Sequence, residues 1–339
     1  MVSAVIAPTG PTDGGLPETI DALVATGRAG DAWRLLGTRA AASDPTALFM
    51  LAVWRLAGQF VRRDLAQSRD LFQRAARAGH PDAARIHRAF LAGGVGGPPD
   101  WAAALQLLAQ AAKTESAARA QLALIAGMRL SSSGEPQEIP AEEQLSESPR
   151  VSCVRGLLSR AECEYLIAEA QRWLAPSVVV DPQTGRQYRN PIRTSDGMAF
   201  PFTEENPAIH ALNRRIAAVT NTGVAQGEPL QVLRYRPGQE YKPHSDALTG
   251  DDNQRLITVL LYLNRGYEGG ETRFVETGLT FRGEVGDALV FHNADAEGRA
   301  DPLARHAGLP VTKGEKYLST RWIRARAFSL PPPRPLLDI

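Results

Sequence analysis

LQVLRY at residues 230–235 and RLITVLLYLN at 255–264 are runs of β-branched, apolar and aromatic residues, a composition typical of strands. Three later runs share this composition: GLTFR (278–282), DALVFHN (287–293) and KYLSTRWIRARAF (316–328). Gly, Asp and Asn residues separate the runs, as expected at turns. The second half of the chain is therefore predicted to be rich in short strands.

Two helices are predicted before these strands. Ser159 followed three residues later by Glu162 is the pattern of a capping box at a helix start. Pro207 suits the first turn of a second helix over residues 206–221. Helices followed by many short strands indicate a β-sandwich or a jelly roll with supporting helices.

The first part of the chain is rich in Ala and Leu and repeats itself. A shift of 36 residues superposes three pairs, Leu35-Leu36, Leu71-Phe72 and Leu107-Leu108, and three alanines, Ala40, Ala76 and Ala112. Asp64 and Asp100 lie at matching positions where a side chain can cap a helix. A period of this length, with two helices per unit, predicts an α-solenoid and resembles tetratricopeptide repeats, particularly their Sel-like subfamily.

Changes in composition divide the chain into domains. Residues 130–149 contain five Glu and no basic residue, which is typical of a linker. We expect a disordered N-terminus (1–16), an α-helical repeat domain (17–128), a linker (129–149), a catalytic β-rich domain (150–328) and a C-terminal surface tail (329–339).

The overall charge excludes some classes of partner. Lys and Arg total 38 and Asp and Glu total 37, so the net charge of +1 favours neither nucleic acid nor an anionic membrane as a partner. No apolar run is long enough to span a bilayer, and MVSAVIAPTG at the start lacks the basic region of a secretory signal. The only two cysteines, Cys153 and Cys163, give no disulfide framework, so we expect a cytoplasmic protein.

The sequence His244-Ser245-Asp246 places two candidate metal ligands on one face of a predicted strand. The chain contains this spacing a second time, at His80-Pro81-Asp82, where it falls at a repeat turn. There we expect Asp82 to cap a helix and His80 to be a surface turn residue.

His306 is the expected third ligand, because two His and one carboxylate on one face of a metal select non-haem Fe(II) and leave positions open. Lys316, one of only four Lys in the chain, follows ten residues later. A buried cation needs an anion, which the distal carboxylate of 2-oxoglutarate would supply. His292 competes as the third ligand, but no Lys follows it at a comparable distance, so we expect it to be a strand-end or supporting residue.

These pieces lie in an order that resembles the catalytic domain of prolyl 4-hydroxylases, within the Fe(II)/2-oxoglutarate dioxygenases. The resemblance covers about residues 149–327 and rests on six motifs: L-S-x-x-E-C (158–163), R-T-S-x-G-M (193–198), Q-V-L-R-Y-x-x-G-Q-x-Y-x-x-H-x-D (231–246), T-V-L-L-Y-L-N (258–264), G-G-E-T-x-F (269–274) and H-A-G-x-P-V-x-x-G-x-K (306–316). It implies a double-stranded β-helix (jelly-roll) fold with supporting helices, in which His244, Asp246 and His306 are the iron ligands. It also implies that Lys316 binds 2-oxoglutarate.

The resemblance implies further site residues. Tyr235 and, as a lesser candidate, Tyr262 would hold 2-oxoglutarate, and Arg193 and Trp322 would lie near the prime substrate. Tyr262 and Trp322 could equally be core aromatics of strands. Tyr188 belongs to the stretch RQYRNPIRTS (186–195), which is either a solvated loop or a flap over a peptide.

The implied reaction couples oxidative decarboxylation of 2-oxoglutarate by O2, at Fe(II), to hydroxylation of a C–H bond, with ascorbate as a possible reductant. We expect a prolyl residue of a protein or peptide as the target, recruited by the α-solenoid. Two alternatives remain: an oxygenase of the same class acting on a non-prolyl residue or a small molecule, and a repeat scaffold with a catalytically silent barrel.

Overall fold

The computed structural model describes residues 15–180, 187–189, 191–329 and 335–337. The distances between Cα atoms divide the chain into two units. The helical unit comprises Met1–Ala123, Phe202–His210 and Ser329–Ile339, and the sheet unit comprises Leu124–Pro201 and Ala211–Phe328. The expectation of a disordered N-terminus over 1–16 falls almost entirely outside the described residues.

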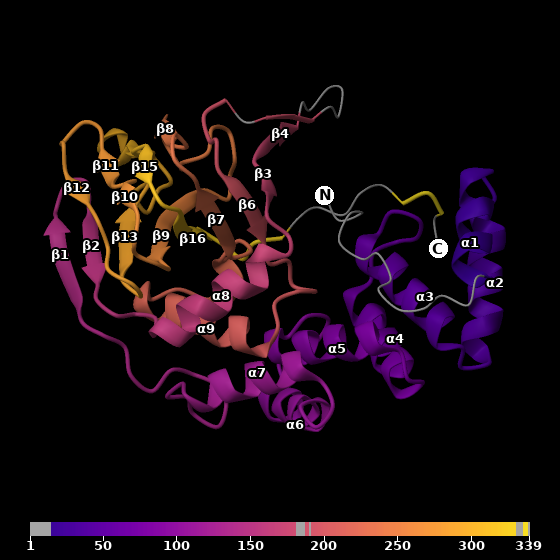
Figure 1. Cartoon of the computed structure of the whole chain (residues 1–339). Coiled ribbons are helices and arrows are strands. Elements are labelled where there is room, and N and C mark those ends of the chain that lie inside the picture. The colour runs from indigo at the N-terminus through magenta and orange to yellow at the C-terminus, as the bar shows by residue number, and fades with distance from the viewer. Residues whose placement is uncertain (1–14, 181–186, 190, 330–334, 338–339) are drawn as a thin grey trace. The chain divides into compact units, whose positions relative to one another are not determined.

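The N-terminal helices follow the predicted repeat. Helices α2, α4 and α6 begin at Ala29, Leu65 and Trp101, which are 36 residues apart, and each is followed by a second helix. The helices in Figure 1 are α1 (Leu16–Ala25), α2 (Ala29–Ala41), α3 (Pro45–Ala57), α4 (Leu65–Arg77), α5 (Pro81–Gly93), α6 (Trp101–Ala111) and α7 (Ser116–Ala126). The helical hairpin repeat is thereby confirmed.

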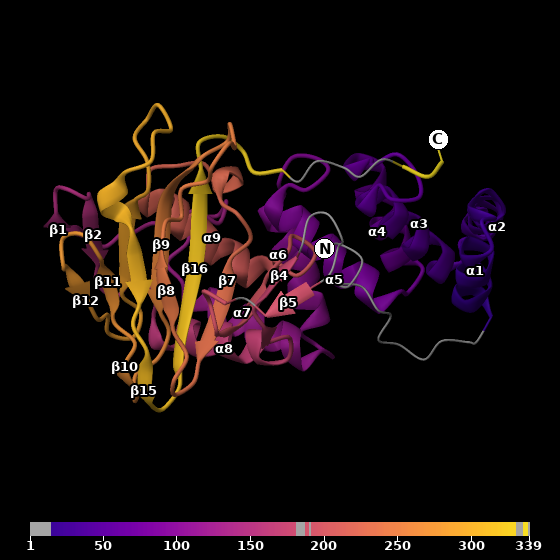
Figure 2. The same cartoon turned by 90° about the horizontal axis from the view of Figure 1, so that it is seen from above.

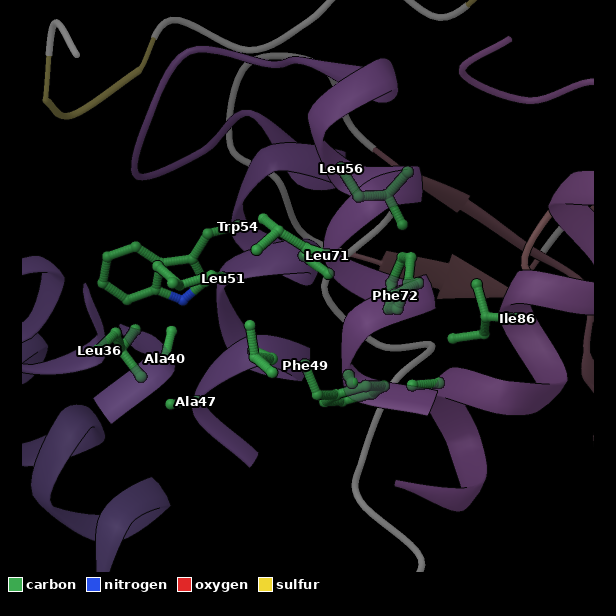
Figure 3. Close-up of a cluster of buried hydrophobic side chains, with 14 of the residues drawn as sticks. Leu36, Ala40, Ala47, Phe49, Leu51, Trp54, Leu56, Leu71, Phe72 and Ile86 are labelled. Atoms are coloured by element: carbon green, nitrogen blue, oxygen red, sulfur yellow. The ribbon is translucent and has the colours of Figure 1, made fainter. Parts of the chain in front are cut away.

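The repeated apolar positions are buried. Leu36, Phe72 and Leu108, which match across three repeats, are each 0% exposed. Figure 3 shows Leu36 and Phe72 among the side chains that fill the interior between helices. Phe72 contacts two further rings edge-on, Phe49 at 5.7 Å and Phe90 at 5.5 Å between centroids.

The helix starts confirm two predicted caps and correct a third. The Asp64 and Asp100 side chains accept hydrogen bonds from backbone amides in the first turns of α4 and α6. The prediction that Asp82 caps a helix is wrong, because Pro81 takes the first helical position of α5 and leaves His80 as the N-cap residue. The His80 Nδ1 accepts from the backbone amide of Ala83 at 3.4 Å.

The sheet unit contains two larger antiparallel sheets, as the jelly-roll prediction requires. An eight-stranded sheet has the order β1-β2-β13-β9-β16-β7-β6-β3, and a four-stranded sheet has the order β12-β11-β14-β8. Figure 2 shows β16 between β9 and β7 in the larger sheet. Their strands are β1 (Glu142–Ser146), β2 (Val151–Val154), β3 (Ala175–Pro176), β6 (Asp196–Ala199), β7 (Gln231–Tyr235), β8 (Tyr241–His244), β9 (Arg255–Tyr262), β11 (Thr272–Phe274), β12 (Thr280–Phe281), β13 (Ala288–His292), β14 (His306–Gly308) and β16 (Lys316–Arg324).

Two small hairpins accompany these sheets. Strand β4 (Val178–Val180) pairs with β5 (Gln187–Arg189), and β10 (Glu268–Gly269) pairs with β15 (Val311–Lys313). Strand β16 ends at Arg324, four residues before the predicted end of its run.

Two helices support the large sheet. Helix α8 (Arg160–Gln171) begins with the predicted capping box between Ser159 and Glu162. Helix α9 (Pro207–Val219) begins with the predicted proline. A salt bridge of 2.8 Å joins Arg215 Nη1 of α9 to Glu162 Oε2 of α8. Because both side chains are largely buried, this pair fixes one helix against the other.

The predicted linker differs from the structure. Residues 142–146 form β1, which pairs with β2 at one edge of the eight-stranded sheet, and the whole of 129–149 belongs to the sheet unit. The run EEQLS is mostly polar and exposed, which is the composition that suggested a linker. No helix within the described ranges is both long and apolar enough to cross a membrane.

Candidate metal centre

Strand pairing brings the three predicted metal ligands together. His244 ends β8 and His306 begins β14, and the register of these strands places the two residues directly opposite each other. Asp246 follows β8 by two residues. One ligand atom from each residue lies within 4.8 Å of the other two, and this is the only such His/Cys/Asp/Glu group in the part of the chain that the structure describes.

Backbone carbonyls fix the orientation of both histidine rings. The Nδ1 of His244 lies 2.8 Å from the carbonyl of Lys242, and the Nδ1 of His306 lies 3.0 Å from the carbonyl of Ala304. A carbonyl only accepts, so each Nδ1 carries the proton and each Nε2 keeps a lone pair for a metal. The two Nε2 atoms lie 3.6 and 3.7 Å from the Asp246 carboxylate.

Asp246 and His306 hold the protonation states that a metal needs at neutral pH. Burial alone would raise the pKa of the Asp246 carboxyl, but His244, His306 and the Thr258 hydroxyl hold it well below its usual range. Burial lowers the pKa of His306 to about 4. The site therefore offers the imidazole nitrogens of two histidines and one carboxylate, a donor set that fits Fe(II) and leaves coordination positions for other ligands.

Lys316 is buried in the wall of the same cavity and is 2% exposed. Its Nζ donates to the Gly270 carbonyl at 2.6 Å and lies over the rings of Tyr235 and Tyr262, at 5.6 and 5.4 Å from their centroids. Burial lowers the pKa of Lys316 to about 7. An anion in the cavity would restore full charge to this side chain, which fits the distal carboxylate of 2-oxoglutarate.

Only one of the two tyrosines predicted to hold 2-oxoglutarate lines the cavity. Tyr235 pairs directly with Lys316 across β7 and β16, and it lines the cavity. Tyr262 is fully buried in an apolar cluster and is not among the cavity-lining residues. Its hydroxyl instead meets the Thr272 hydroxyl at 2.8 Å, and Thr272 lines the cavity. Tyr262 therefore supports the wall from behind.

The residues predicted near the prime substrate fall in different places. Arg193 and Trp322 both line the cavity that contains the metal ligands and Lys316. The Trp322 Nε1 is buried and has no hydrogen-bond partner among the described residues. Tyr188 lies on β5, is 50% exposed and is not among the lining residues.

The histidines assigned other roles are also outside the metal group. His292, the competing third ligand, ends β13 and is absent from the cluster found in the described residues. Burial, together with the charge of Arg150, lowers its pKa. His80 stacks on Phe49, with ring centroids 4.1 Å apart, in the helical unit.

Sequence reasoning missed three residues beside the metal ligands. Thr258 Oγ1 donates to Asp246 Oδ2 at 2.7 Å and accepts from Asn293 Nδ2 at 2.8 Å. Tyr241 stacks on the His244 ring with centroids 3.4 Å apart. Thr258 is the one hydroxyl in the otherwise apolar run ITVLL, and that contrast is the signal that could have identified it.

A second missed group holds Trp322 in place. The Arg255 guanidinium lies 3.8 Å from the centroid of the Trp322 ring. Arg255 also donates to both carboxylate oxygens of Glu228, at 2.7 and 3.0 Å. This stacked and doubly hydrogen-bonded arrangement fixes the indole in the cavity wall.

This fold, with two His and one carboxylate beside a buried Lys, defines an iron- and 2-oxoglutarate-dependent oxygenase. The family model described as "2OG-Fe(II) oxygenase superfamily" matches residues 230–324. Prolyl 4-hydroxylase 1 of Arabidopsis thaliana is 38% identical over 206 residues, which cover 55% of this chain and 73% of that protein. The chain belongs to the prolyl 4-hydroxylase family.

Two further relatives have similar names. Probable prolyl 4-hydroxylase 3 of Arabidopsis thaliana is 35% identical over 212 residues, covering 56% of this chain and 74% of that protein. The crystal structure of a viral collagen prolyl hydroxylase from Paramecium Bursaria Chlorella virus-1 is 31% identical, with 52% of this chain and 96% of that chain covered and a TM-score of 0.42.

Proposed function

We propose that the protein hydroxylates C4 of a prolyl residue in a protein or peptide. The observation that carries this proposal is the single cavity lined by His244, Asp246, His306 and the buried Lys316. The relatives named prolyl 4-hydroxylases support proline as the target. Iron and 2-oxoglutarate, when bound, would supply the oxidising chemistry with O2: one oxygen atom of O2 converts the C–H bond to C–OH, and the other enters succinate as 2-oxoglutarate loses CO2.

Different residues of the chain would position the iron and 2-oxoglutarate. The Nε2 atoms of both histidines and the Asp246 carboxylate would hold the iron on one side. Lys316 would bind the distal carboxylate of 2-oxoglutarate, and Tyr235 would confine it laterally. Apolar lining residues exclude water from this part of the cavity and strengthen the ionic contact, namely Leu233, Leu260 and Leu318.

Trp322 supplies the clearest contact for the prime substrate. A buried indole N–H without a partner favours a ligand that brings an acceptor, such as a peptide carbonyl. Arg193 lies nearby, donating from Nε to Ser177 Oγ at 3.1 Å, and it also lines a second cavity of about 270 Å³. We assign Arg193 and this adjoining cavity to the peptide that flanks the target proline, and the exposed Tyr188 to its outer edge.

The test is Fe(II)- and 2-oxoglutarate-dependent succinate formation with a proline-containing polypeptide. Mass spectrometry should find one added oxygen on proline, and a matched peptide with Ala in place of Pro should give only background succinate. The His244→Ala variant should be inactive. Oxygen added to another residue, or turnover of small molecules alone, would instead favour the alternative substrate class. Failure to bind both Fe(II) and 2-oxoglutarate would favour a silent barrel.

We further propose that the helical repeats, which resemble Sel-like tetratricopeptide units, recruit the protein target. Ascorbate as a reductant and a cytoplasmic location are parts of the same proposal. The location is supported by Cys153 and Cys163, which are buried free thiols. Burial raises the pKa of Cys153 to about 11 and that of Cys163 to about 12, so neither is an activated thiolate.

A further inference from the structure

A chain of two buried hydrogen bonds leads from the Asp246 carboxylate to Asn293. The Thr258 hydroxyl donates to Asp246 Oδ2 at 2.7 Å, and the Nδ2 of Asn293 donates to that hydroxyl at 2.8 Å. Thr258 lies on β9, and Asn293 directly follows β13, the neighbouring strand of the larger sheet (Figure 1). Asn293 is 1% exposed and is not among the residues that line the cavity. It therefore contacts the metal site only through Thr258.

The chemistry of these three groups fixes the direction of both hydrogen bonds. A carboxylate only accepts, so the single hydrogen of the Thr258 hydroxyl points toward Asp246. Toward Asn293 the hydroxyl can then only accept, and the amide must present its NH2 group. This donor occupies a lone pair of the hydroxyl oxygen, keeps the hydrogen on the side of Asp246 and makes the hydroxyl a stronger donor.

The backbone of Asn293 is fixed at both of its polar groups. Its amide donates to the Leu256 carbonyl of β9 at 2.8 Å, and its carbonyl accepts from the Asp301 amide at 2.8 Å. Asp301 is the N-cap residue of the single helical turn that ends at Ala304, whose carbonyl lies 3.0 Å from the Nδ1 of His306. Asn293 is thus joined to Asp246 through its side chain and to the segment that orients His306 through its backbone.

Packing alone does not account for an amide at this position. The Oδ1 of Asn293 is buried and has no hydrogen-bond partner among the described residues. Burying a polar atom without a partner costs free energy, and an apolar side chain of similar size would avoid that cost. The hydrogen bond to Thr258 is what the amide provides in return.

We propose that Asn293 is a positioning residue of the metal centre: its amide holds the Thr258 hydroxyl as a donor to Asp246 and so keeps this carboxylate oriented for the metal. The inference depends on the metal site and not on which substrate the protein hydroxylates.

Metal affinity tests this role without catalysis. In titrations of the metal-free, full-length chain with Mn(II), we expect Asn293→Leu to bind about fivefold more weakly than the wild type, because the Thr258 hydroxyl is no longer held. Asn213→Leu is the matched control. Asn213 lies in α9, is fully buried and has no hydrogen-bond partner for its amide among the described residues, so its variant should bind Mn(II) as the wild type does. Equal losses in the two variants would overturn the proposal.

A double-mutant cycle distinguishes positioning through Thr258 from a separate structural effect. If Asn293 acts only through the hydroxyl, Thr258→Val/Asn293→Leu should bind Mn(II) as weakly as Thr258→Val alone, about tenfold below the wild type. Independent effects would multiply to about fiftyfold. A fiftyfold loss, or an unchanged affinity of Asn293→Leu, would contradict the proposal.

A spectroscopic signature and a second variant separate positioning from misfolding. The visible absorption of the Co(II)-loaded protein depends on the geometry of the ligands. Asn293→Leu should shift these bands in the same direction as Thr258→Val, and Asn213→Leu should leave them in place. Circular dichroism checks the fold, and Asn293→Ala, which adds no bulk, replaces the Leu variant if that variant is unfolded. Loss of the fold in both would show a structural role and overturn the proposal.

Kinetics connects the metal centre to the reaction and keeps the two proposals apart. With a proline peptide, Asn293→Leu should need about fivefold more Fe(II) for half-maximal succinate formation, while KM for the peptide stays unchanged. If the Mn(II) cycle shows the expected coupling but no prolyl peptide is turned over, the role of Asn293 stands and the proposed function fails. If prolyl peptides are turned over but the cycle is multiplicative, the proposed function stands and the role of Asn293 fails.

Discussion

Lys316 is deeply buried, which disfavours its charged form, yet it must be charged to bind a carboxylate. The binding of 2-oxoglutarate should therefore depend on pH. Its pKa is lowered to about 7 by burial, so the free side chain is protonated below that pH and loses its proton above it. A bound carboxylate raises this pKa again, because it favours the charged form. Binding of 2-oxoglutarate above about pH 7 must therefore take up a proton.

We expect the affinity for 2-oxoglutarate to fall by up to about tenfold per pH unit above pH 7. Titration calorimetry on the Mn(II)-loaded protein measures this slope. The Lys316→Arg variant keeps the cation but removes the titration, so its affinity should change little over the same range. A wild-type affinity independent of pH would show that Lys316 is charged throughout.

Thr258 orients a metal ligand without touching the metal. We expect Thr258→Val to weaken metal binding by about tenfold, because the Asp246 carboxylate loses the hydrogen bond that fixes its orientation. Thr258→Ser retains the hydroxyl and should bind metal nearly as the wild type does. Mn(II) titration of the metal-free protein is the measurement, and equal affinities for the Val and Ser variants would refute the orienting role.

The sequence could predict the metal ligands but not the whole cavity wall. His244, Asp246 and Lys316 were predictable because their residue types and their spacing along the chain indicate metal and anion binding even when the fold is unknown. Whether Tyr262 and Trp322 face the cavity depends on strand register, which one sequence does not reveal. The contacts of Thr258, Asn293 and Arg255 join strands that are distant in the chain, so spacing gave no indication of them.

At the scale of helices and strands, periodicity was the most informative signal. Asp64 and Asp100, 36 residues apart, correctly indicated the starts of α4 and α6, and α2 begins one further interval earlier. Polar composition was less reliable. Strand β1 lies at an edge, exposes most of its side chains and lacks the alternating apolar pattern, so it could not be distinguished from a linker by composition. The cap at His80 was missed because Pro81 shifts the helix start.

Two glycines of the repeats allow two costs of adding a side chain to be compared, that of a left-handed backbone alone and that of a left-handed backbone with a steric clash. Gly79 and Gly96 both have positive φ, +95° and +72°, but only Gly96 is crowded, since an added Cβ would lie 2.1 Å from the Leu65 carbonyl oxygen. We expect Gly79→Ala to cost about 1 kcal/mol and Gly96→Ala clearly more. Urea unfolding followed by circular dichroism makes the comparison, and equal losses would contradict the close approach.

At the scale of the whole molecule, each unit has buried clusters of its own. Phe72 belongs to the cluster of the helical unit, and the metal ligands belong to the sheet unit. We expect Phe72→Ala to lower the free energy of unfolding of the helical unit by about 3–5 kcal/mol while Mn(II) affinity stays unchanged. Chemical unfolding and metal titration on one preparation test this, and a parallel loss of metal binding would show that the units depend on each other.

The two ends of the eight-stranded sheet affect how the protein behaves at high concentration. An open sheet edge can pair with a strand of another molecule and start aggregation. Strand β1 places the exposed Glu142 and Glu143 at one edge, and β3 at the other edge has only two residues, one of them Pro176. Negative charge and a residue without an amide proton both oppose such pairing. The acidic stretch that was predicted to be a linker therefore also opposes edge-to-edge association of the protein.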